Sequence, residues 1–201
     1  PPRYMKLLEI IPGEKTKKDI VDFMVNFSES VLGKGVVVCK DRPNFIGNRI
    51  GSFDMANAAH VMFSKGLKIE ELDAIISKPL GRPSSAIFGT IDLVGLDTGF
   101  HVSKNLYEAV PDDEMRDYFK PNELTLKMIE NKWLGNKTKQ GYYKRTKDEK
   151  GKKLKLVLDY KTLEYVVPTK PVFESIEAAK KTPGGFAAKL KVLFNGTDVA
   201  A

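Results

Sequence analysis

Asn48 is a residue whose side chain could bind a substrate oxygen. It lies in residues 41–49, where Pro43 sets a rigid turn at or near the first turn of an expected helix. The side-chain amide offers both a donor and an acceptor to a carbonyl or hydroxyl group. An Asn this close to a helix start is also commonly solvated or capping, so both interpretations stay open.

Glu9 is the second residue that could take part in polar chemistry. It stands inside the apolar run Leu-Leu-Glu-Ile-Ile, which is typical of a strand. A carboxylate there either faces water from an edge strand or is buried beside a His or Arg partner, because a buried unpaired carboxylate costs several kcal/mol. Periodicity alone favours the solvated alternative and leaves the paired one open.

The remaining candidates for acid–base or metal chemistry are His60 and His101. Both lie in patterns typical of helices, where a structural histidine is the more common case, and no metal-ligand spacing connects them. The single cysteine, Cys39, excludes an intrachain disulfide framework and a cysteine-rich zinc site, and it fits a reducing compartment. The chain has no Gly-x-Gly-x-x-Gly, Walker lysine motif or nucleophile elbow. Spacing alone therefore gives no complete active site and no metal site.

The elements that position Glu9 and Asn48 begin with a strand, a helix and a second strand. The first strand is expected over about residues 5–11, and the second over 36–39, a β-branched run that is hydrophobic on both faces like a buried strand. Between them, Thr16 can cap a helix that ends near two glycines. Its apolar residues at helical spacing are Ile20, Phe23, Met24 and Phe27.

The rest of the chain is mainly helical. Four stretches have patterns typical of helices, separated by glycines and prolines, and predict a compact domain of four or five helices: residues 44–65, 69–77, 88–109 and 122–131. A two- or three-stranded ribbon and two short helices are expected next, over residues 142–145, 154–158 and 163–167, then 173–181 and 186–194. The predicted fold class is therefore mainly α, with a β-α-β unit in front and a small β ribbon and short helices behind.

The charge balance narrows the classes of partner. Thirty-three Lys plus Arg against 26 Asp plus Glu give a net charge of +7, and much of the excess lies in residues 137–161. A solvated basic turn is the favoured interpretation, with a nucleic-acid patch or phosphate contacts to a cofactor as alternatives. The composition is that of a globular chain, and no apolar run approaches the roughly 20 residues that cross a bilayer. We therefore expect a soluble, cytoplasmic protein.

Four separated blocks carry a resemblance to a known family, and they occur in the family's order: residues 1–11, 39–50, 92–98 and 130–143. The first resembles the stretch that follows a His-Phe-Phe-Asn-Pro signature, with Pro1 at its proline, and the second resembles a strand-to-helix junction that enters a C-terminal domain. Together they resemble the 3-hydroxyacyl-CoA dehydrogenases of fatty-acid β-oxidation, in particular large multifunctional members fused to an enoyl-CoA hydratase. The resemblance covers residues 1 to about 145 and continues more loosely into what looks like a linker to a second helical repeat.

Two departures from the family pattern matter, and only the second concerns the domains. Residues 83–91 stand where the family has Pro-Met-Gly-Pro-Phe-Glu-Leu and hold one extra residue, which affects the local loop. The Rossmann domain with its glycine fingerprint, and the catalytic His, would lie upstream of Pro1. The resemblance thus implies three parts. They are the tail of the NAD-binding domain (1–42), the helical C-terminal domain (43–145), and a ribbon, linker and start of a second repeat (146–201).

The resemblance also implies roles for single residues in an NAD-dependent oxidation of 3-hydroxyacyl-CoA to 3-ketoacyl-CoA. Glu9 maps onto the acidic partner of the catalytic His, which reverses the preference for a solvated carboxylate. A carboxylate bonded to imidazole fixes its tautomer and stabilises the imidazolium. Asn48 maps onto an asparagine that contacts the substrate, and Lys137 maps onto a lysine that reaches NAD.

The expected partners are an acyl-CoA substrate, the missing Rossmann domain in cis, and a second copy of the chain through the helix from Asn44. This segment alone is expected to be inactive, and neither nucleic acid nor a membrane span is expected. The main alternative is a non-catalytic helical interaction module, in which Glu9 and Asn48 are structural and the basic turn binds an acidic partner. A nucleic-acid-binding domain that uses residues 144–155 is the second alternative.

Overall fold

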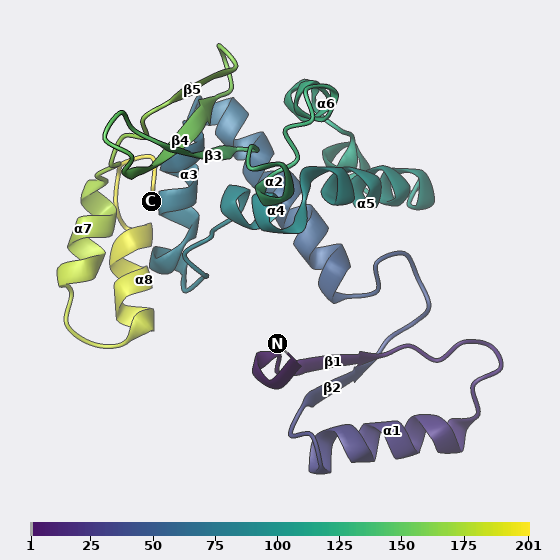
Figure 1. Ribbon diagram of the computed structural model, residues 1–201. Helices are drawn as coiled ribbons and strands as arrows, with labels where there is room; N and C mark the ends of the chain where they lie inside the picture. Colours follow the sequence, from purple (N-terminus) through teal and green to yellow (C-terminus); the bar gives the residue numbers. More distant parts are fainter. Residues whose placement is uncertain (1) are drawn as a thin grey trace.

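The computed structural model describes residues 2–201, so Pro1, the residue expected at the proline of the signature, lies outside the described residues. Figure 1 shows a small β-α-β unit at the N-terminus and a larger helical body that carries a sheet and two C-terminal helices. The predicted fold class, mainly α with a β-α-β unit before it and a ribbon behind, is confirmed. Among the described helices, none combines the length and apolar character that spanning a membrane requires.

The N-terminal unit consists of a short 3-10 turn, two parallel strands and one helix: η1 (Pro2–Tyr4), β1 (Leu7–Ile10), α1 (Lys18–Ser30) and β2 (Gly35–Val38). Leu7 pairs with Gly35 and Ile10 with Val38, so β1 and β2 are in register along their whole length. The helix α1 makes the crossover between the two strands (Figure 1), as parallel strands require. The predicted strand-helix-strand order is confirmed.

Two details predicted for this unit are wrong. Thr16 does not cap α1, because its hydroxyl accepts a hydrogen bond from Gly13 N–H at 3.0 Å and closes the preceding turn instead. The second strand is not buried on both faces, since Val37 and Val38 are 37% and 52% exposed. In the part of the chain that the structure describes, this sheet has only two strands, so each strand has one edge without a pairing partner.

The body is built from five α-helices joined by turns and short 3-10 helices: α2 (Gly47–Lys65), α3 (Ile69–Ile76), η2 (Lys78–Leu80), α4 (Phe88–Val94), α5 (Leu96–Ala109), η3 (Arg116–Phe119), α6 (Glu123–Glu130) and η4 (Asn136–Thr138). The helix expected over 88–109 is two helices, because Gly95 has φ +105° and ends α4. Pro43 lies in the turn before α2 and not in its first helical turn, since α2 begins only at Gly47.

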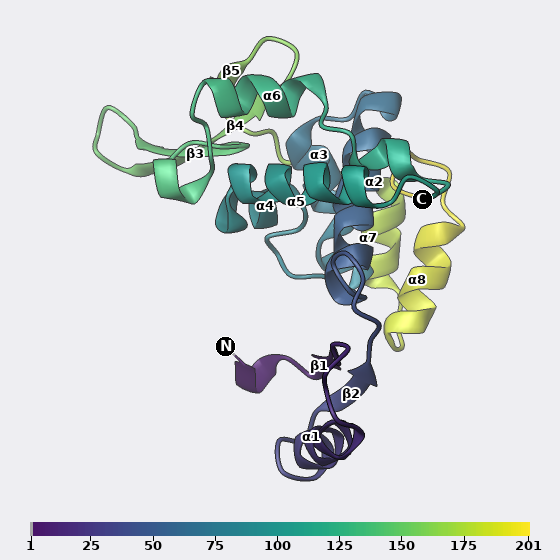
Figure 2. The same cartoon turned by 90° about the vertical axis from the view of Figure 1, so that its right-hand side faces the viewer.

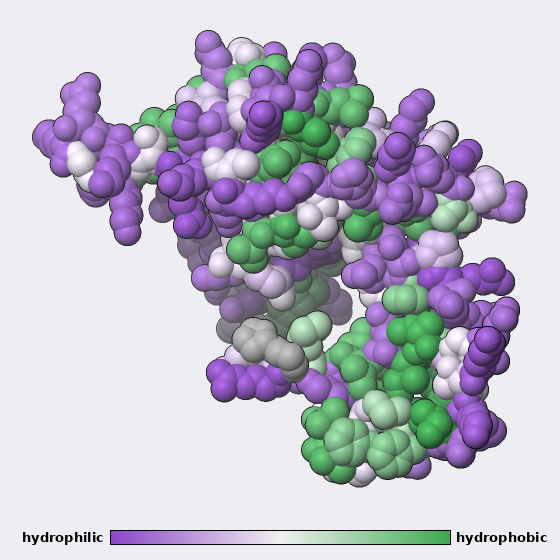
Figure 3. Space-filling view, turned by 45° about the vertical axis from the view of Figure 1, so that its right-hand side comes forward, coloured by the Kyte–Doolittle hydropathy of each residue, from purple (hydrophilic) through white to green (hydrophobic). Residues whose placement is uncertain are grey.

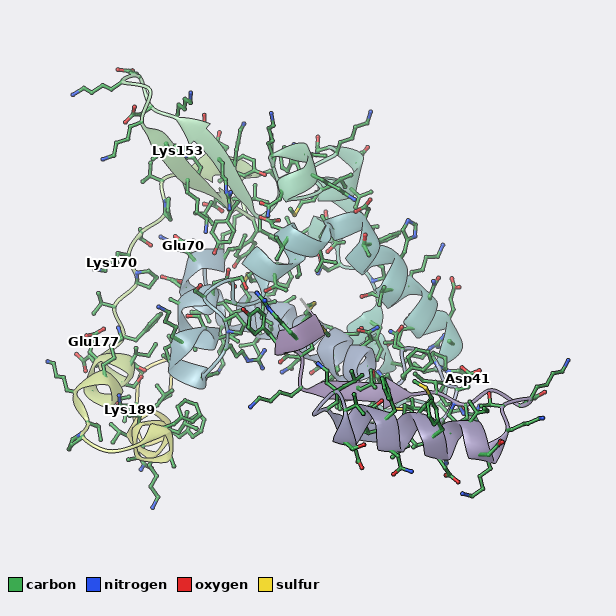
Figure 4. All side chains as sticks on the ribbon, turned by 60° about the horizontal axis from the view of Figure 1, so that its bottom comes forward. Asp41, Glu70, Lys153, Lys170, Glu177 and Lys189 are labelled. Carbon is green, nitrogen blue, oxygen red and sulfur yellow. The ribbon has the colours of Figure 1, made fainter. Side chains whose placement is uncertain are left out.

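A three-stranded antiparallel sheet and a helix pair complete the molecule: β3 (Tyr143–Lys147), β4 (Lys153–Asp159), β5 (Glu164–Val166), α7 (Glu174–Lys181) and α8 (Phe186–Phe194). The helices α7 and α8 pack against each other along one side of the body (Figure 2). The linker before them is tied to α3, because the Thr169 hydroxyl donates to Glu70 Oε1 at 3.1 Å. Figure 4 labels Glu70 on α3 and Lys170 on the linker. The predicted ribbon and short helices are confirmed.

One hydrophobic core joins the body to the sheet and the C-terminal helices. Its most buried members come from α2, α3, α4, α6, β4 and α8: Met62, Ile69, Phe88, Met128, Val157, Leu158 and Leu193. Because the same cluster includes residues of α7 and α8, the C-terminal segment is part of one folded unit with the helical domain.

Candidate active site

Glu9 bonds to the backbone at the start of α2. Its Oε1 accepts hydrogen bonds from Ile46 N–H at 2.9 Å and from Gly47 N–H at 2.8 Å, and the Cys39 thiol donates to the same oxygen at 3.6 Å. These backbone bonds hold the pKa of Glu9 below its ordinary value, so the carboxylate is ionised at neutral pH. Within residues 2–201, Oε2 accepts no hydrogen bond. Glu9 therefore joins the N-terminal unit to the body and keeps one oxygen for a further donor.

The turn before α2 presents its N–H groups to Glu9 at a conformational cost. Asn44 and Phe45 have φ +63° and +52°, and left-handed geometry costs a non-glycine residue about 1–2 kcal/mol. The Asn44 side-chain nitrogen is buried without a hydrogen-bond partner among the described residues. Both Asn44 Nδ2 and Glu9 Oε2 therefore leave polar capacity unused at this junction.

Cys39 is a neighbour of Glu9 that sequence reasoning did not assign to the site. Burial raises the pKa of the thiol, and the negative charge of Glu9 raises it further. Cys39 thus stays protonated and acts as a donor to Glu9, since a reactive cysteine needs the opposite shift. Only the pairing of β1 with β2 brings the two residues together, so no local pattern signals the contact.

Asn48 is the second residue of α2 and lies directly beyond the N–H groups that bind Glu9. It lines a cavity of about 390 Å³ between α2, α4, α5 and η3, within the size range of small-molecule sites. Most of the wall is apolar, with Met55, Ile91 and Phe119 among its residues. The structure therefore brings Glu9 and Asn48 to one helix start, and sets the Asn48 amide beside an apolar cavity.

Lys137 lies in η4 and forms an ion pair with Asp97, in the first turn of α5. The hydrogen bond from Lys137 holds the pKa of Asp97 below its ordinary value. Lys137 does not line the cavity, but Leu96 and Thr98, on either side of its partner, do. Lys137 is thus held on the α5 side of the cavity, whereas Asn48 belongs to the α2 side.

Two buried carboxylates fix the part of the fold that carries Lys137. Asp92 is 3% exposed and accepts hydrogen bonds from Tyr142 N–H and Tyr143 N–H, each at 2.8 Å. Asp73 accepts from Phe88 N–H at 3.0 Å and from the Tyr143 hydroxyl at 2.7 Å. Burial raises the pKa of Asp92 to about 6 and also raises that of Asp73. For Asp92 the sequence does hold a signal, since a carboxylate stands inside the apolar helical run Thr-Ile-Asp-Leu-Val.

The histidines play no part in this arrangement. His60 lies on α2 with its ring 4.8 Å from that of Tyr118, and His101 lies on α5 with its ring 5.5 Å from that of Phe100. In the described part of the chain, no group of three His, Cys, Asp or Glu residues could hold a metal ion.

Two family models match the chain. The sequence model described as "3-hydroxyacyl-CoA dehydrogenase, C-terminal domain" matches residues 45–145, and that described as "3-hydroxyacyl-CoA dehydrogenase, NAD binding domain" matches residues 1–42. The chain belongs to the 3-hydroxyacyl-CoA dehydrogenase family. The expectation of NAD as cofactor is confirmed at the level of this domain match.

Relatives and solved structures support the same assignment. The chain is 44% identical over 200 residues to a probable 3-hydroxyacyl-CoA dehydrogenase of Bacillus subtilis, and covers 100% of itself but 24% of that protein. It is 35% identical over 166 residues to a putative fatty acid oxidation complex trifunctional enzyme of Rickettsia prowazekii, covering 82% and 23%. The crystal structure of M. tuberculosis FadB2 matches with a TM-score of 0.62 at 26% identity, covering 72% of this chain and 49% of that one. The chain thus spans about a quarter of the length of these two relatives.

The residues present fit a supporting contact to NAD but not a complete dinucleotide site. The turn after β1 reads Ile-Pro-Gly-Glu-Lys and lacks the glycine pattern that cradles a pyrophosphate. The Lys137 ammonium has three donors, and its pairing with Asp97 leaves the others for a ligand.

Proposed function

We propose that this chain is part of an NAD-dependent 3-hydroxyacyl-CoA dehydrogenase that oxidises 3-hydroxyacyl-CoA to 3-ketoacyl-CoA in fatty-acid β-oxidation. In this proposal the intact protein is multifunctional and also contains an enoyl-CoA hydratase. The observation that carries the proposal is the convergence of an ionised Glu9 and the Asn48 amide at the start of α2, beside an apolar cavity.

Glu9 has the geometry of a positioning carboxylate for a histidine supplied from upstream. Its Oε1 is fixed by two backbone N–H groups, so the carboxylate is held in one orientation and Oε2 can accept from a further donor. An imidazole N–H bound there would hold its second nitrogen as the base for the 3-hydroxyl proton. The lowered pKa of Glu9 keeps the carboxylate charged, and the charge stabilises the imidazolium as it forms.

Asn48 would bind the reacting oxygen, because its amide can accept from a hydroxyl and donate to the carbonyl that replaces it. A bound NAD would supply the acceptor for the hydride of the carbon that carries this oxygen. Lys137 would contact NAD with the donors that Asp97 leaves free. The apolar cavity behind Asn48 would receive the acyl chain, since its wall offers mainly hydrocarbon contacts.

The proposed domain division explains an exposed apolar surface on the N-terminal unit. Phe23 and Val38 are 62% and 52% exposed, and Figure 3 shows hydrophobic side chains over much of this lobe. In the proposal, residues 1–42 are the tail of an NAD-binding domain whose other strands and helices cover this face. Residues 43–145 form the helical domain, and residues 146–201 form the ribbon, linker and start of a second repeat.

A second copy of the chain is a further proposed partner of α2. Ile50 is 64% exposed and Phe63 38% exposed on this helix, so an apolar surface is available for self-association.

The experiment that tests the catalytic proposal is Glu9→Gln in the full-length protein. Glutamine keeps an oxygen that can accept from Ile46 and Gly47, so the tether to α2 survives while the charge is lost. We expect turnover to fall by about a hundredfold or more with little change in KM, since the lost interaction forms mainly in the transition state. Asn48→Ala should raise KM as well as lower turnover.

Glu14→Gln, in the exposed turn after β1, is the matched control and should leave both constants unchanged. Thermal melts must show that Glu9→Gln folds like the wild type. Near-normal turnover in a folded Glu9→Gln protein would reduce Glu9 to a structural tether. The 201-residue chain alone should give no NAD-dependent oxidation of 3-hydroxybutyryl-CoA, because in this proposal the catalytic His and most of the dinucleotide fold belong to another part of the intact protein.

A further inference from the structure

Four cations stand on one face of the hairpin β3–β4. Arg145 is directly opposite Lys155 in the strand register, and Lys147 is directly opposite Lys153. Side chains two residues apart on a strand point to the same face, so the two pairs form one ladder. Like charges directly opposite each other destabilise a sheet. Within residues 2–201 none of the four forms an ion pair, and the carboxylates of Asp73 and Asp92 act on Lys155 only from a longer distance.

The ladder ends in a cavity of about 460 Å³ at the base of the hairpin. Three cations line it, Lys139, Arg145 and Lys155, together with the polar side chains of Ser85 and Asn136. The carboxylate in the wall is Asp92, and both of its oxygens already accept backbone N–H groups. With three cations against this one carboxylate, the cavity wall carries an excess of positive charge.

The Lys155 ammonium is positioned by its contact with the Tyr143 ring. It lies 3.5 Å from the centroid of that ring, and the Tyr143 hydroxyl is fixed by Asp73. Partial burial lowers the pKa of Lys155, the negative charges of Asp73 and Asp92 oppose this shift in part, and the nearby Arg145 adds to it. An anion in the cavity would relieve both lowering effects.

The cavity is separate from the one that contains Asn48. Gly89 and Asp92 of α4 line the cationic cavity, whereas Phe88 and Ile91 of the same helix line the apolar one. Two cavities thus lie against different faces of α4. A ligand in the cationic cavity would not occupy the place of the acyl chain in the function proposed above.

We propose that this cavity is a binding site for the phosphate groups of a small phosphorylated molecule. A guanidinium and two ammonium groups around one hollow suit a multiply charged oxyanion. Ser85 and Asn136 also line the cavity and supply neutral hydrogen-bonding groups. This concave geometry fits a small ligand better than the backbone of a duplex, which needs cations along an extended exposed surface. Figure 4 labels Lys153, farther out on the hairpin, where the ladder continues to solvent.

Calorimetric titration of the full chain at constant ionic strength tests the site. Inorganic pyrophosphate and adenosine 3′,5′-bisphosphate are the two probes, and they distinguish a site for free phosphates from one for a nucleotide. Saturable binding of either supports the proposal, and Arg145→Gln should weaken it at least tenfold. Lys144→Gln is the matched control, because it removes the same charge from the same strand but on the opposite face, where Lys144 lies over Tyr165.

A second readout separates ligand binding from a structural role. Without ligand, Arg145→Gln should melt at or slightly above the wild-type temperature at low salt, because the variant loses a repulsive pair. With pyrophosphate, the wild type should gain stability and the variant should not. If Arg145→Gln fails to fold, Lys139→Gln, which also removes a cation from the cavity lining, must show the same loss of binding.

Three outcomes would overturn the site. The first is no saturable binding of either probe by the wild type, and the second is an equal loss of binding in Lys144→Gln and Arg145→Gln. The third is tight duplex binding with a steep salt dependence that pyrophosphate does not displace, which would make the hairpin a nucleic-acid surface.

Discussion

The N-terminal unit and the helical body differ in how they are stabilised. In residues 3–42 only Ser28 and Cys39 are buried, whereas the body, the sheet and the C-terminal helices share one continuous core. Figure 2 shows the unit standing apart from the body, and Glu9 supplies side-chain hydrogen bonds across this junction. A region can therefore hold regular strands and a helix while leaving most of its apolar surface uncovered. Its secondary structure follows from local pattern, but its stability depends on what packs against it.

The largest effect is expected from Gly141→Ala in the body. A Cβ at Gly141 would overlap the Asp92 carboxylate and would lie 2.6 Å from the Cα of Gly135. It would force Asp92 away from the N–H groups of Tyr142 and Tyr143, so we expect a loss of about 4 kcal/mol or more in unfolding free energy. Urea unfolding of both proteins measures this loss of unfolding free energy. Gly33→Ala in the N-terminal unit, where no atom lies within 4 Å, should show only the smaller cost of its left-handed backbone.

Two phenylalanines test the comparison directly. Phe88 is 1% exposed and packs against Tyr142 with ring centroids 4.6 Å apart, so Phe88→Ala should cost about 3–5 kcal/mol. Phe23 is exposed on α1, and Phe23→Ala should change the stability of the 201-residue chain by less than about 0.5 kcal/mol. In the full-length protein, Phe23→Ala should cost several times more if other strands and helices cover it. Equal, small effects in both proteins would mean that nothing covers α1.

The contributions of Asp92 and Glu9 to the free energy of unfolding should change in opposite directions with pH. Burial raises the pKa of Asp92 to about 6, so its contribution to stability is full below its ordinary pKa and is lost as pH rises through 6. The loss approaches about 3 kcal/mol between pH 4 and 7. The pKa of Glu9 is lowered, so its contribution is present above the ordinary pKa and is lost on acidification.

Unfolding free energies of the wild type and Asp92→Asn, compared from pH 4 to 8, isolate the first effect. As pH rises through this range, the unfolding free energy of the wild type should fall relative to that of Asp92→Asn. A difference that stays constant across this range would contradict the raised pKa of Asp92.

The smallest expected effect compares two candidate helix caps. Asn122 caps α6, because its side chain accepts from Thr125 N–H at 2.8 Å, and Asn122→Ala should cost about 1 kcal/mol. Thr16 bonds to Gly13 and not to α1, so Thr16→Ala should cost less and leave the helix content unchanged. Circular dichroism during thermal melting would detect both. A larger loss for Thr16→Ala would restore the cap predicted from sequence.

The sequence by itself determined which segments become helices and strands, and it pointed to Glu9 and Asn48. Hydrophobic periodicity is a local property, so the strand-helix-strand order, the body helices and the ribbon could be predicted from neighbouring residues. The roles of Glu9, Asn48 and Lys137 came from resemblance to a family, since spacing alone left each of them open. The break at Gly95 was missed because the apolar pattern continues through it.

Only the tertiary structure decided which polar groups meet. Glu9 bonds to N–H groups 37 and 38 residues away, and Asp92 to N–H groups 50 and 51 residues away. The ladder of Arg145 and Lys155 likewise exists only because two strands pair in one register. Hydrogen bonds and like-charge pairs depend on distances of a few ångströms between remote segments, and those distances are set by how the core packs. The exposure of Val38 has the same origin, because a strand is buried only when another element covers it.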